Sequence, residues 1–358
     1  MMPIVDKSKL KRSDIIELFE FRQNFRNQVN KAFFKSVSYS EDDYKPIWEK
    51  VGKLNKHWLN GEEVKKSLSL KEQILLAEHL RFYIEYSADY RETLSPNPKD
   101  AIREPIKANN VRCEWFFNHG VREDQAILFI HGGGHIMGSS NSHKLLTFRL
   151  SRVTKTKVLS INYRLAPENP HPAALKDCVS VYKWLLTSGF QSKNIIIAGD
   201  SAGGYYTLLT LLKLRDDGVS LPAGAICLSP STDMAQTGES VKTNCYTDIV
   251  LGDLGYIWWI ECHLAGKDPF HPSVSPLYAD LTGLPPILLQ VSTSEMLFDD
   301  SKRFYENAMK GRVDILMQTW DNTLHVFQNT DLPEAEEALE KIKKFTEKVF
   351  KKIIKPEM

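Results

Sequence analysis

The chain has 358 residues, 42% of them apolar, and is long enough to bury one large core or two smaller ones. Its 46 basic and 45 acidic side chains leave a formal charge of +1, which argues against charge-driven binding to nucleic acid or to an acidic surface. The sequence has no cysteine spacing typical of a zinc site, no phosphate-binding loop and no apolar run long enough to span a bilayer.

The five cysteines are scattered along the chain, and their odd number suits a reducing compartment. The first ten residues are polar and rich in lysine, and they lack the apolar stretch of a signal peptide. These features predict a cytoplasmic protein.

Residues 1–107 are predicted to be mainly helical. Apolar side chains recur at near-helical spacing over residues 15–33, with basic residues between them. Ser69 and Glu72 have the spacing of a capping box, which predicts the start of a further helix. We expect these helices to form part of a cap on a second domain that spans 108–358. Contact of their basic, amphipathic faces with a membrane surface is the less favoured interpretation.

A glycine-rich loop follows the second strand predicted in this domain. The first strand is expected at 111–117 and the second at 126–130, which runs directly into the sequence HGGGH at 131–135. Three successive glycines leave backbone N–H groups uncovered, and donors fixed in this way are what an oxyanion hole needs. His131 fits a residue that braces the loop better than one that carries a proton. The candidate oxyanion residues in this loop are Gly132, Gly133 and Gly134.

The most informative stretch is GDSAGG at 199–204, which follows a short apolar run at 194–198. A strand before and a helix after G-x-S-x-G are the context in which this motif carries a nucleophilic serine. The turn is too sharp for side chains at its flanking positions, so Ser201 is held in a strained conformation with its hydroxyl above the sheet. The helix that begins at Ala202 directs its free N–H groups at the same point. Ser201 is therefore the predicted nucleophile.

Other polar residues near these loops are predicted to be structural. Arg164, Glu168 and Asp177 are expected to form a polar network beneath the loops, and Asp200 is expected to brace the serine turn. We expect none of them to act in the chemistry.

The chain beyond the serine is predicted to supply a second cap segment and two more strands. The cap segment spans about 234–270 and contains an apolar run. The strands are expected at 287–291 and 314–320. Glu295 follows the first of them, and His325 follows the second.

Three motifs resemble those of the hormone-sensitive-lipase-like (arylacetamide deacetylase-like) carboxylesterases of the α/β-hydrolase superfamily. They are HGGG at 131–134, YRLAPE at 163–168 and GDSAGG at 199–204, and the resemblance spans about 108–350. It implies an α/β-hydrolase fold, with helices on both sides of a mostly parallel central sheet and a helical cap. It also implies a serine hydrolase that acts on small to medium hydrophobic esters and needs no cofactor or metal ion.

The resemblance also implies roles for single residues. In this family an acid and then a histidine follow the serine along the chain, and His325 occupies the position of the base after the last strand. Glu295 matches the position of the acid, with glutamate in place of the commoner aspartate; this is tolerable because the acid only orients the histidine and stabilises its charge. Asp299, about one helical turn later, is the alternative acid. The N–H of Ala202 joins the glycine loop in the implied oxyanion hole.

Four side chains are candidates for the substrate pocket under the cap. They are His135, Tyr205, Trp258 and Trp259. The pocket size, and with it the acyl and alcohol preference, depends on how the cap folds over the serine. The oligomeric state is left open.

Two alternative functions are compatible with the same fold. Hydrolysis of a lactone or an amide would use the same residues and differ only in the leaving group. A non-catalytic receptor for a hydrophobic ligand is the alternative from another class. The presence of Ser201, an acidic candidate and His325 weighs against a receptor.

Overall fold

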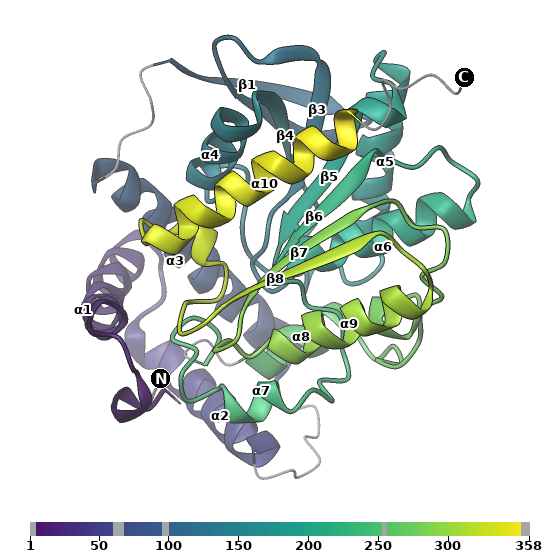
Figure 1. Cartoon of the computed structure of the whole chain (residues 1–358). Coiled ribbons are helices and arrows are strands. Elements are labelled where there is room, and N and C mark those ends of the chain that lie inside the picture. The colour runs from purple at the N-terminus through teal and green to yellow at the C-terminus, as the bar shows by residue number, and fades with distance from the viewer. Residues whose placement is uncertain (1–4, 60–67, 95–99, 253–255, 352–358) are drawn as a thin grey trace, which may run out of the picture.

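The computed structural model describes residues 5–59, 68–94, 100–252 and 256–351. Within these ranges the strands are β1 (Ala101–Ala108), β2 (Val111–Asn118), β3 (Arg122–Ile130), β4 (Thr156–Asn162), β5 (Ile195–Asp200), β6 (Gly224–Leu228), β7 (Ile287–Ser292) and β8 (Ile315–Trp320). They form one sheet in the order β1-β2-β4-β3-β5-β6-β7-β8 (Figure 1). β2 is antiparallel to both its neighbours, and the strands from β4 to β8 run parallel. The predicted α/β class with a mostly parallel central sheet is confirmed.

Helices cover both faces of the sheet. The described helices are α1 (Ser13–Ser36), α2 (Glu41–Leu59), α3 (Leu70–Leu94), α4 (Lys144–Thr154), α5 (Ala173–Thr187), α6 (Ala202–Asp216), α7 (Ser240–Thr243), α8 (Tyr256–Leu264), α9 (Phe298–Lys310) and α10 (Pro333–Lys351). α4 and α10 pack on one face, and α5, α6 and α9 pack on the other (Figure 1). Because side chains alternate along a strand, Ile127 and Phe129 of β3 face α4 and α10, while Leu128 faces the opposite layer.

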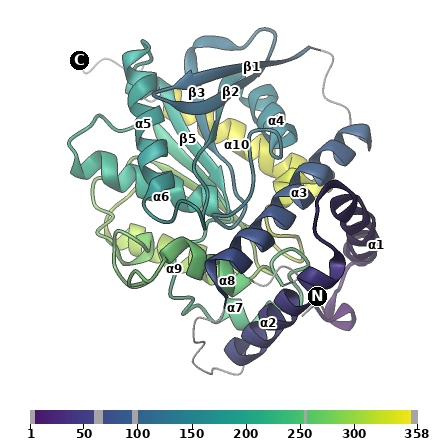
Figure 2. The ribbon, with the colours of Figure 1, turned by 180° about the vertical axis from the view of Figure 1, so that it is seen from behind.

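The N-terminal helices lie beside the carboxyl end of the parallel strands, where α3 packs on α1 and α4, and α2 packs on α8 (Figure 2). The predicted capping box is confirmed, since Ser69 N donates to Glu72 Oε2 at 2.8 Å and Glu72 N donates to Ser69 Oγ at 3.3 Å. Leu76 and Leu80 of the helix it opens are buried in the main core. The division into a cap region and a catalytic domain stays a prediction.

A strand does lie at the predicted position 111–117, but it is the second strand of the sheet and not the first, because β1 precedes it. β1 falls inside the region predicted to be helical. It is an edge strand whose residues Arg103, Glu104 and Pro105 are exposed, so it lacks the apolar alternation that marks a half-buried strand. Polar edge strands of this kind escape a search for hydrophobic periodicity.

The structure bears on two sequence features noted above, the lack of a membrane-spanning run and the scattered cysteines. In the part of the chain that is described, no helix is both long and apolar enough to cross a membrane. All five cysteines are buried free thiols.

Candidate active site

Ser201 occupies a tight turn between β5 and α6. Its backbone has φ 52° and ψ −119°, a conformation that a residue with a side chain adopts only when its surroundings enforce it. The flanking glycines leave room for this turn, because a Cβ on Gly203 would lie 1.8 Å from the carbonyl oxygen of Ile130. The predicted need for glycine beside the serine is confirmed.

The structure brings Ser201, His325 and Glu295 together. His325 Nε2 lies 2.9 Å from Ser201 Oγ, and His325 Nδ1 lies 2.9 Å from Glu295 Oε1. The three side chains come from the loops after β5, β8 and β7, which all end at the same edge of the sheet. All three residues are buried. This is the geometry of a nucleophile joined to a base that a carboxylate orients.

The two ionisable partners influence each other's protonation. Burial raises the pKa of Glu295, while the charge of His325 and its hydrogen bond oppose that rise. Burial alone would lower the pKa of His325, but the charge and hydrogen bond of Glu295 outweigh burial and raise it above the usual value. The carboxylate therefore makes the imidazole a stronger base.

Ser229, which the sequence does not single out, links the two loops that carry this pair. Its hydroxyl donates to Glu295 Oε2 at 2.7 Å and accepts the N–H of Val326 at 3.3 Å. Ser292 N donates to the same carboxylate oxygen at 3.1 Å. Only the fold reveals this contact, because Ser229 and Glu295 lie 66 residues apart along the chain.

Asp299 and Asp300 lie in the first turn of α9 and bind elsewhere. Asp299 Oδ2 accepts the N–H of Ser240 at 2.8 Å. Asp300 Oδ2 accepts the N–H groups of Thr232 at 2.6 Å and Asp233 at 2.9 Å, and burial raises the pKa of Asp300 to about 7. Both carboxylates thus hold the segment that follows β6, while Glu295 is the one that contacts the histidine.

The glycine loop after β3 lies against the serine turn. The carbonyl of Gly133 accepts the N–H groups of Ile136 at 3.2 Å and Met137 at 3.0 Å, which closes the loop into a turn. Gly133 has φ 115°, and a Cβ there would lie 2.2 Å from the carbonyl oxygen of Met137. No hydrogen bond among the described residues uses the N–H groups of Gly133, Gly134 or Ala202, so these donors are free for a ligand.

Gly132 departs from the expected oxyanion role. Its N–H donates to Asp200 Oδ1 at 3.0 Å and is therefore occupied. The close approach of the two loops explains this contact, because a Cβ on Gly132 would lie 3.1 Å from Ser201 Cβ. Asp200 also lies 3.3 Å from His143 Nε2, so it joins the serine turn to the glycine loop as a brace. The sequence order could not reveal which of the three glycine N–H groups this carboxylate would bind.

His131 has the contacts of a loop-bracing residue. Its Nδ1 donates to the carbonyl of Gly132 at 2.7 Å, and its ring stacks on Tyr163 with centroids 4.2 Å apart. Burial lowers the pKa of His131 to about 3, so the ring stays neutral. A neutral ring whose N–H binds a backbone carbonyl and whose face stacks on Tyr163 fits the bracing role predicted for His131.

Tyr205 and His135 were expected in the substrate pocket, but both lie in a buried cluster of rings. The hydroxyl of Tyr205 lies 2.9 Å from His263 Nε2, and His135 stacks on His263 at 3.9 Å. Tyr205 has 0% exposed surface, so the structure places it in the core rather than in a pocket. His263 belongs to α8, and this partner, 58 residues along the chain from Tyr205, could not be inferred from the sequence.

The two tryptophans of α8 are also buried, and one of them lies against the glycine loop. A Cβ on Gly134 would come within 2.1 Å of Trp259 Cε3, so the indole packs directly on the backbone of that glycine. Trp258 is 1% exposed. Among the candidate pocket residues, Trp259 thus lies against a glycine of the proposed oxyanion hole.

The expected polar network beneath the loops is only partly correct. Arg164 pairs with Asp177 at 2.8 Å. Glu168 instead pairs with Arg81 of α3, at 2.7 Å. The partner of Glu168 therefore comes from the N-terminal helices.

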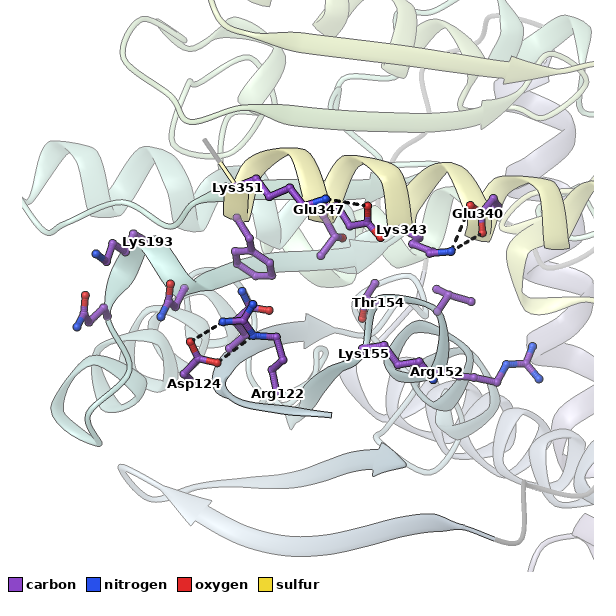
Figure 3. Close-up of a pocket in the computed structure, with 16 residues that line it drawn as sticks. Arg122, Asp124, Arg152, Thr154, Lys155, Lys193, Glu340, Lys343, Glu347 and Lys351 are labelled. Atoms are coloured by element: carbon purple, nitrogen blue, oxygen red, sulfur yellow. Dashed lines mark hydrogen bonds and ion pairs between the residues drawn. The ribbon is translucent and has the colours of Figure 1, made fainter. Parts of the chain in front are cut away.

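An open groove of about 630 Å³ lies near the amino ends of the parallel strands (Figure 3). Its lining includes Arg122 at the start of β3, Lys155 just before β4 and Lys193 just before β5. Ser201 follows the carboxyl end of β5, and six strand residues span about 20 Å. The groove is therefore separate from the serine. Among the described residues, no group of three or more His, Cys, Asp or Glu could hold a metal ion.

A family model described as the alpha/beta hydrolase fold matches residues 127–329. This chain belongs to the α/β-hydrolase superfamily. An acetyl-hydrolase of Streptomyces hygroscopicus is 37% identical to the hydrolase over 238 residues, which cover 66% of this chain and 79% of that protein. An esterase of Acinetobacter venetianus is 38% identical over 252 residues, which cover 70% of this chain and 82% of that protein.

A solved structure gives the branch of the superfamily. The crystal structure of an esterase from the bacterial hormone-sensitive lipase family matches the hydrolase with a TM-score of 0.73 and 34% identity, covering 87% of this chain and 99% of that one. The hydrolase is thus a hormone-sensitive-lipase-like enzyme that acts on carboxylic ester bonds, as the three sequence motifs predicted.

Proposed function

We propose that the enzyme cleaves small to medium hydrophobic esters with Ser201 as nucleophile, His325 as base and Glu295 as the acid that orients the base. The observation that carries this proposal is the continuous hydrogen-bonded line from Glu295 through His325 to Ser201, with both links at 2.9 Å. A hydroxyl needs such a base to become a nucleophile near neutral pH.

The reaction begins when His325 Nε2 takes the proton of Ser201 Oγ as that oxygen attacks the ester carbonyl. The carbonyl oxygen becomes an oxyanion, and the N–H groups of Gly133, Gly134 and Ala202 stabilise it. Since these donors have no other partner in the described structure, no existing hydrogen bond is broken when they bind the oxyanion.

The protonated His325 then gives its proton to the departing alcohol, and the acyl group stays on Ser201. Water enters, His325 removes its proton, and the hydroxide attacks the acyl carbonyl. Collapse of the second tetrahedral intermediate releases the acid and returns the proton to Ser201. Glu295 stays ionised throughout and stabilises the imidazolium formed in each half of the cycle.

A series of p-nitrophenyl esters of increasing acyl length, together with a lactone and a p-nitroanilide, tests the substrate class. We expect saturable hydrolysis of the esters, fastest for short to medium chains, and much slower cleavage of the anilide. The names of the acetyl-hydrolase and esterase relatives favour this ranking. Faster lactone or amide cleavage would favour the alternative leaving groups, and tight ligand binding without turnover would favour a receptor.

The dependence of kcat/KM on pH follows from the state of His325. The imidazole acts as a base only when neutral, so activity rises with pH through its pKa, which Glu295 raises above the usual value of about 6.5. We expect low activity at pH 5 and a single rising limb with its midpoint above about 6.5. Rates measured from pH 5 to 9 check this, and a flat profile would argue against a histidine base.

Replacing Trp259 by alanine is expected to widen the acyl preference. The indole packs on Gly134, so its removal opens space next to the proposed oxyanion hole. We expect kcat/KM for long-chain p-nitrophenyl esters to rise relative to acetate by about tenfold, the scale on which one or two methylene contacts discriminate. Trp258→Ala is the matched control, in which the ratio of kcat/KM for long-chain esters to that for acetate should not change. An unchanged ratio in Trp259→Ala would show that Trp259 does not line the acyl pocket.

A further inference from the structure

One face of α3 carries a row of charged side chains that contact the loop leading from the glycines to α4. Arg81, Glu85 and Asp89 are spaced four residues apart and therefore share one side of the helix. Figure 2 shows α3 extending past α4 toward α8, and α3 packs against α4. The row begins next to the glycine loop and ends at the start of α4.

Arg81 makes four hydrogen bonds at the glycine end of this row. Its Nε donates to the carbonyl of Ile136 at 2.7 Å, and one Nη donates to the carbonyl of Ala166 at 2.9 Å. Both Nη atoms also donate to the carboxylate of Glu168, each at 2.7 Å. A two-point contact with a carboxylate fixes the plane of the guanidinium, so the two bonds to the carbonyls have fixed directions.

The two carbonyls belong to residues that hold the glycine turn in shape. Ile136 N donates to the carbonyl of Gly133 at 3.2 Å, which closes the turn. Ala166 N donates to the carbonyl of His135 at 3.0 Å, which ties the other side of the turn to the segment after β4. Arg81 therefore joins both attachments of the turn that contains Gly133 and Gly134.

The other two charges of the row extend this attachment along the loop. Glu85 accepts the side-chain N–H of Asn141 at 2.9 Å and the hydroxyl of Ser139. Asp89 accepts Lys144 Nζ at 2.9 Å, at the first residue of α4. The whole loop from the glycines to α4 is thus fastened to one rigid helix.

We propose that Arg81 is a positioning residue for the oxyanion hole. Through this side chain, α3 holds the glycine loop in a fixed shape. This inference rests on the proposed role of Gly133 and Gly134. Oxyanion donors act only when they lie about 2.7–3.1 Å from the developing charge, and errors of about 0.5 Å cost rate. Without Arg81, the turn keeps its local hydrogen bonds but loses the link between its two sides.

Arg81→Ala is the test, and Arg215→Ala is its matched control. Arg215, in the last turn of α6, donates to the carbonyls of Asp280 and Thr282 at 2.6 and 2.8 Å and to the carboxylate of Asp216 at 2.9 Å. It therefore makes the same kinds of bonds as Arg81, with similar exposure (23% against 27%), far along α6 from the serine. Equal losses of thermal stability in the two variants would make their activities directly comparable.

We expect Arg81→Ala to lower kcat by about ten- to a hundredfold, less than the loss of an oxyanion donor itself, with KM changed by less than about threefold. The rate at which an organophosphate labels Ser201 should fall in parallel, because that reaction also places an oxygen in the oxyanion hole. The midpoint of the pH profile should not move, since Arg81 does not contact His325. Low concentrations of guanidinium ion should restore part of the activity of Arg81→Ala but none in the control, with sodium chloride at equal concentration having no effect.

Several results would overturn the inference. They are an activity loss no larger than that of Arg215→Ala, a loss confined to KM, or normal labelling of Ser201. Should Arg81→Ala not fold, Arg81→Lys and Glu168→Gln decide the point. Lysine keeps a positive charge beside the carbonyls and the carboxylate, and Glu168→Gln leaves Arg81 in place but removes the charge that orients it. Both variants should show a smaller fall in kcat than Arg81→Ala, with KM unchanged. Normal kcat in both would contradict the inference. Failure of the proposed function would be distinct, because then the unaltered enzyme itself would not be labelled at Ser201.

Discussion

Ser201→Ala is expected to lower ester turnover by about a millionfold while leaving the fold intact, because losing the nucleophile of a triad removes nearly all of its catalysis. The methyl group fits the space of the hydroxymethyl, and the strained backbone is retained. The serine N–H also keeps its hydrogen bond to the carbonyl of Leu228 at 2.8 Å. Circular dichroism and thermal unfolding should therefore match the unaltered enzyme, and the measurement is kcat for a p-nitrophenyl ester.

An organophosphate that forms a covalent adduct gives the same test by another route. Mass spectrometry of the labelled protein should find the adduct on Ser201 alone, and the alanine variant should not be labelled. Ser229 is the control site, because it is also buried in this region but donates its hydroxyl to Glu295. An adduct on another serine, or substantial turnover by Ser201→Ala, would refute the assignment.

The second large effect is expected at the acid. Glu295→Gln should lower kcat by about a thousandfold or more, because the imidazolium loses its stabilising charge and the tautomer of His325 is no longer fixed. This corresponds to about 4 kcal/mol of transition-state stabilisation. The same change removes the charge that raises the pKa of His325, so the residual activity should have its rising limb at lower pH.

Two further variants separate the acid from its neighbours. Glu295→Asp should keep partial activity, limited by the shorter reach of the carboxylate to His325. Asp299→Asn is the matched control: Asp299 binds Ser240 rather than the histidine, so its loss should affect mainly thermal stability. An inactive Asp299→Asn together with a nearly normal Glu295→Gln would reverse the assignment.

The parts of the site that could be predicted are those in which a motif directly follows a strand. GDSAGG after β5 and HGGG after β3 carry their own structural context, so their position at the carboxyl edge of the sheet followed from the sequence. His325 and Glu295 required the family resemblance as well, since a single histidine or glutamate after a strand is common. The structure places His325 within hydrogen-bonding distance of Ser201, and Glu295 within hydrogen-bonding distance of His325.

The side-chain contacts that could not be predicted join partners far apart in the sequence. Gly132 binds Asp200, and Tyr205 turns into the core because His263 of α8 meets its hydroxyl. The charges on α3 fit the pattern of an ordinary solvated helix face, and only the fold brings Arg81 to Ile136. The strand β1 was missed for a different reason, because its exposed charges hide the alternation of an edge strand.

The position of β8 at the end of the sheet has a consequence for how the enzyme emerges from the ribosome. β8 pairs with β7 alone, and the loop after it carries His325. A growing chain therefore contains the serine turn and the glycine loop well before it contains the proposed base. Under the proposed mechanism, a nascent chain that stops before residue 325 has no hydrolytic activity, although its core is already forming.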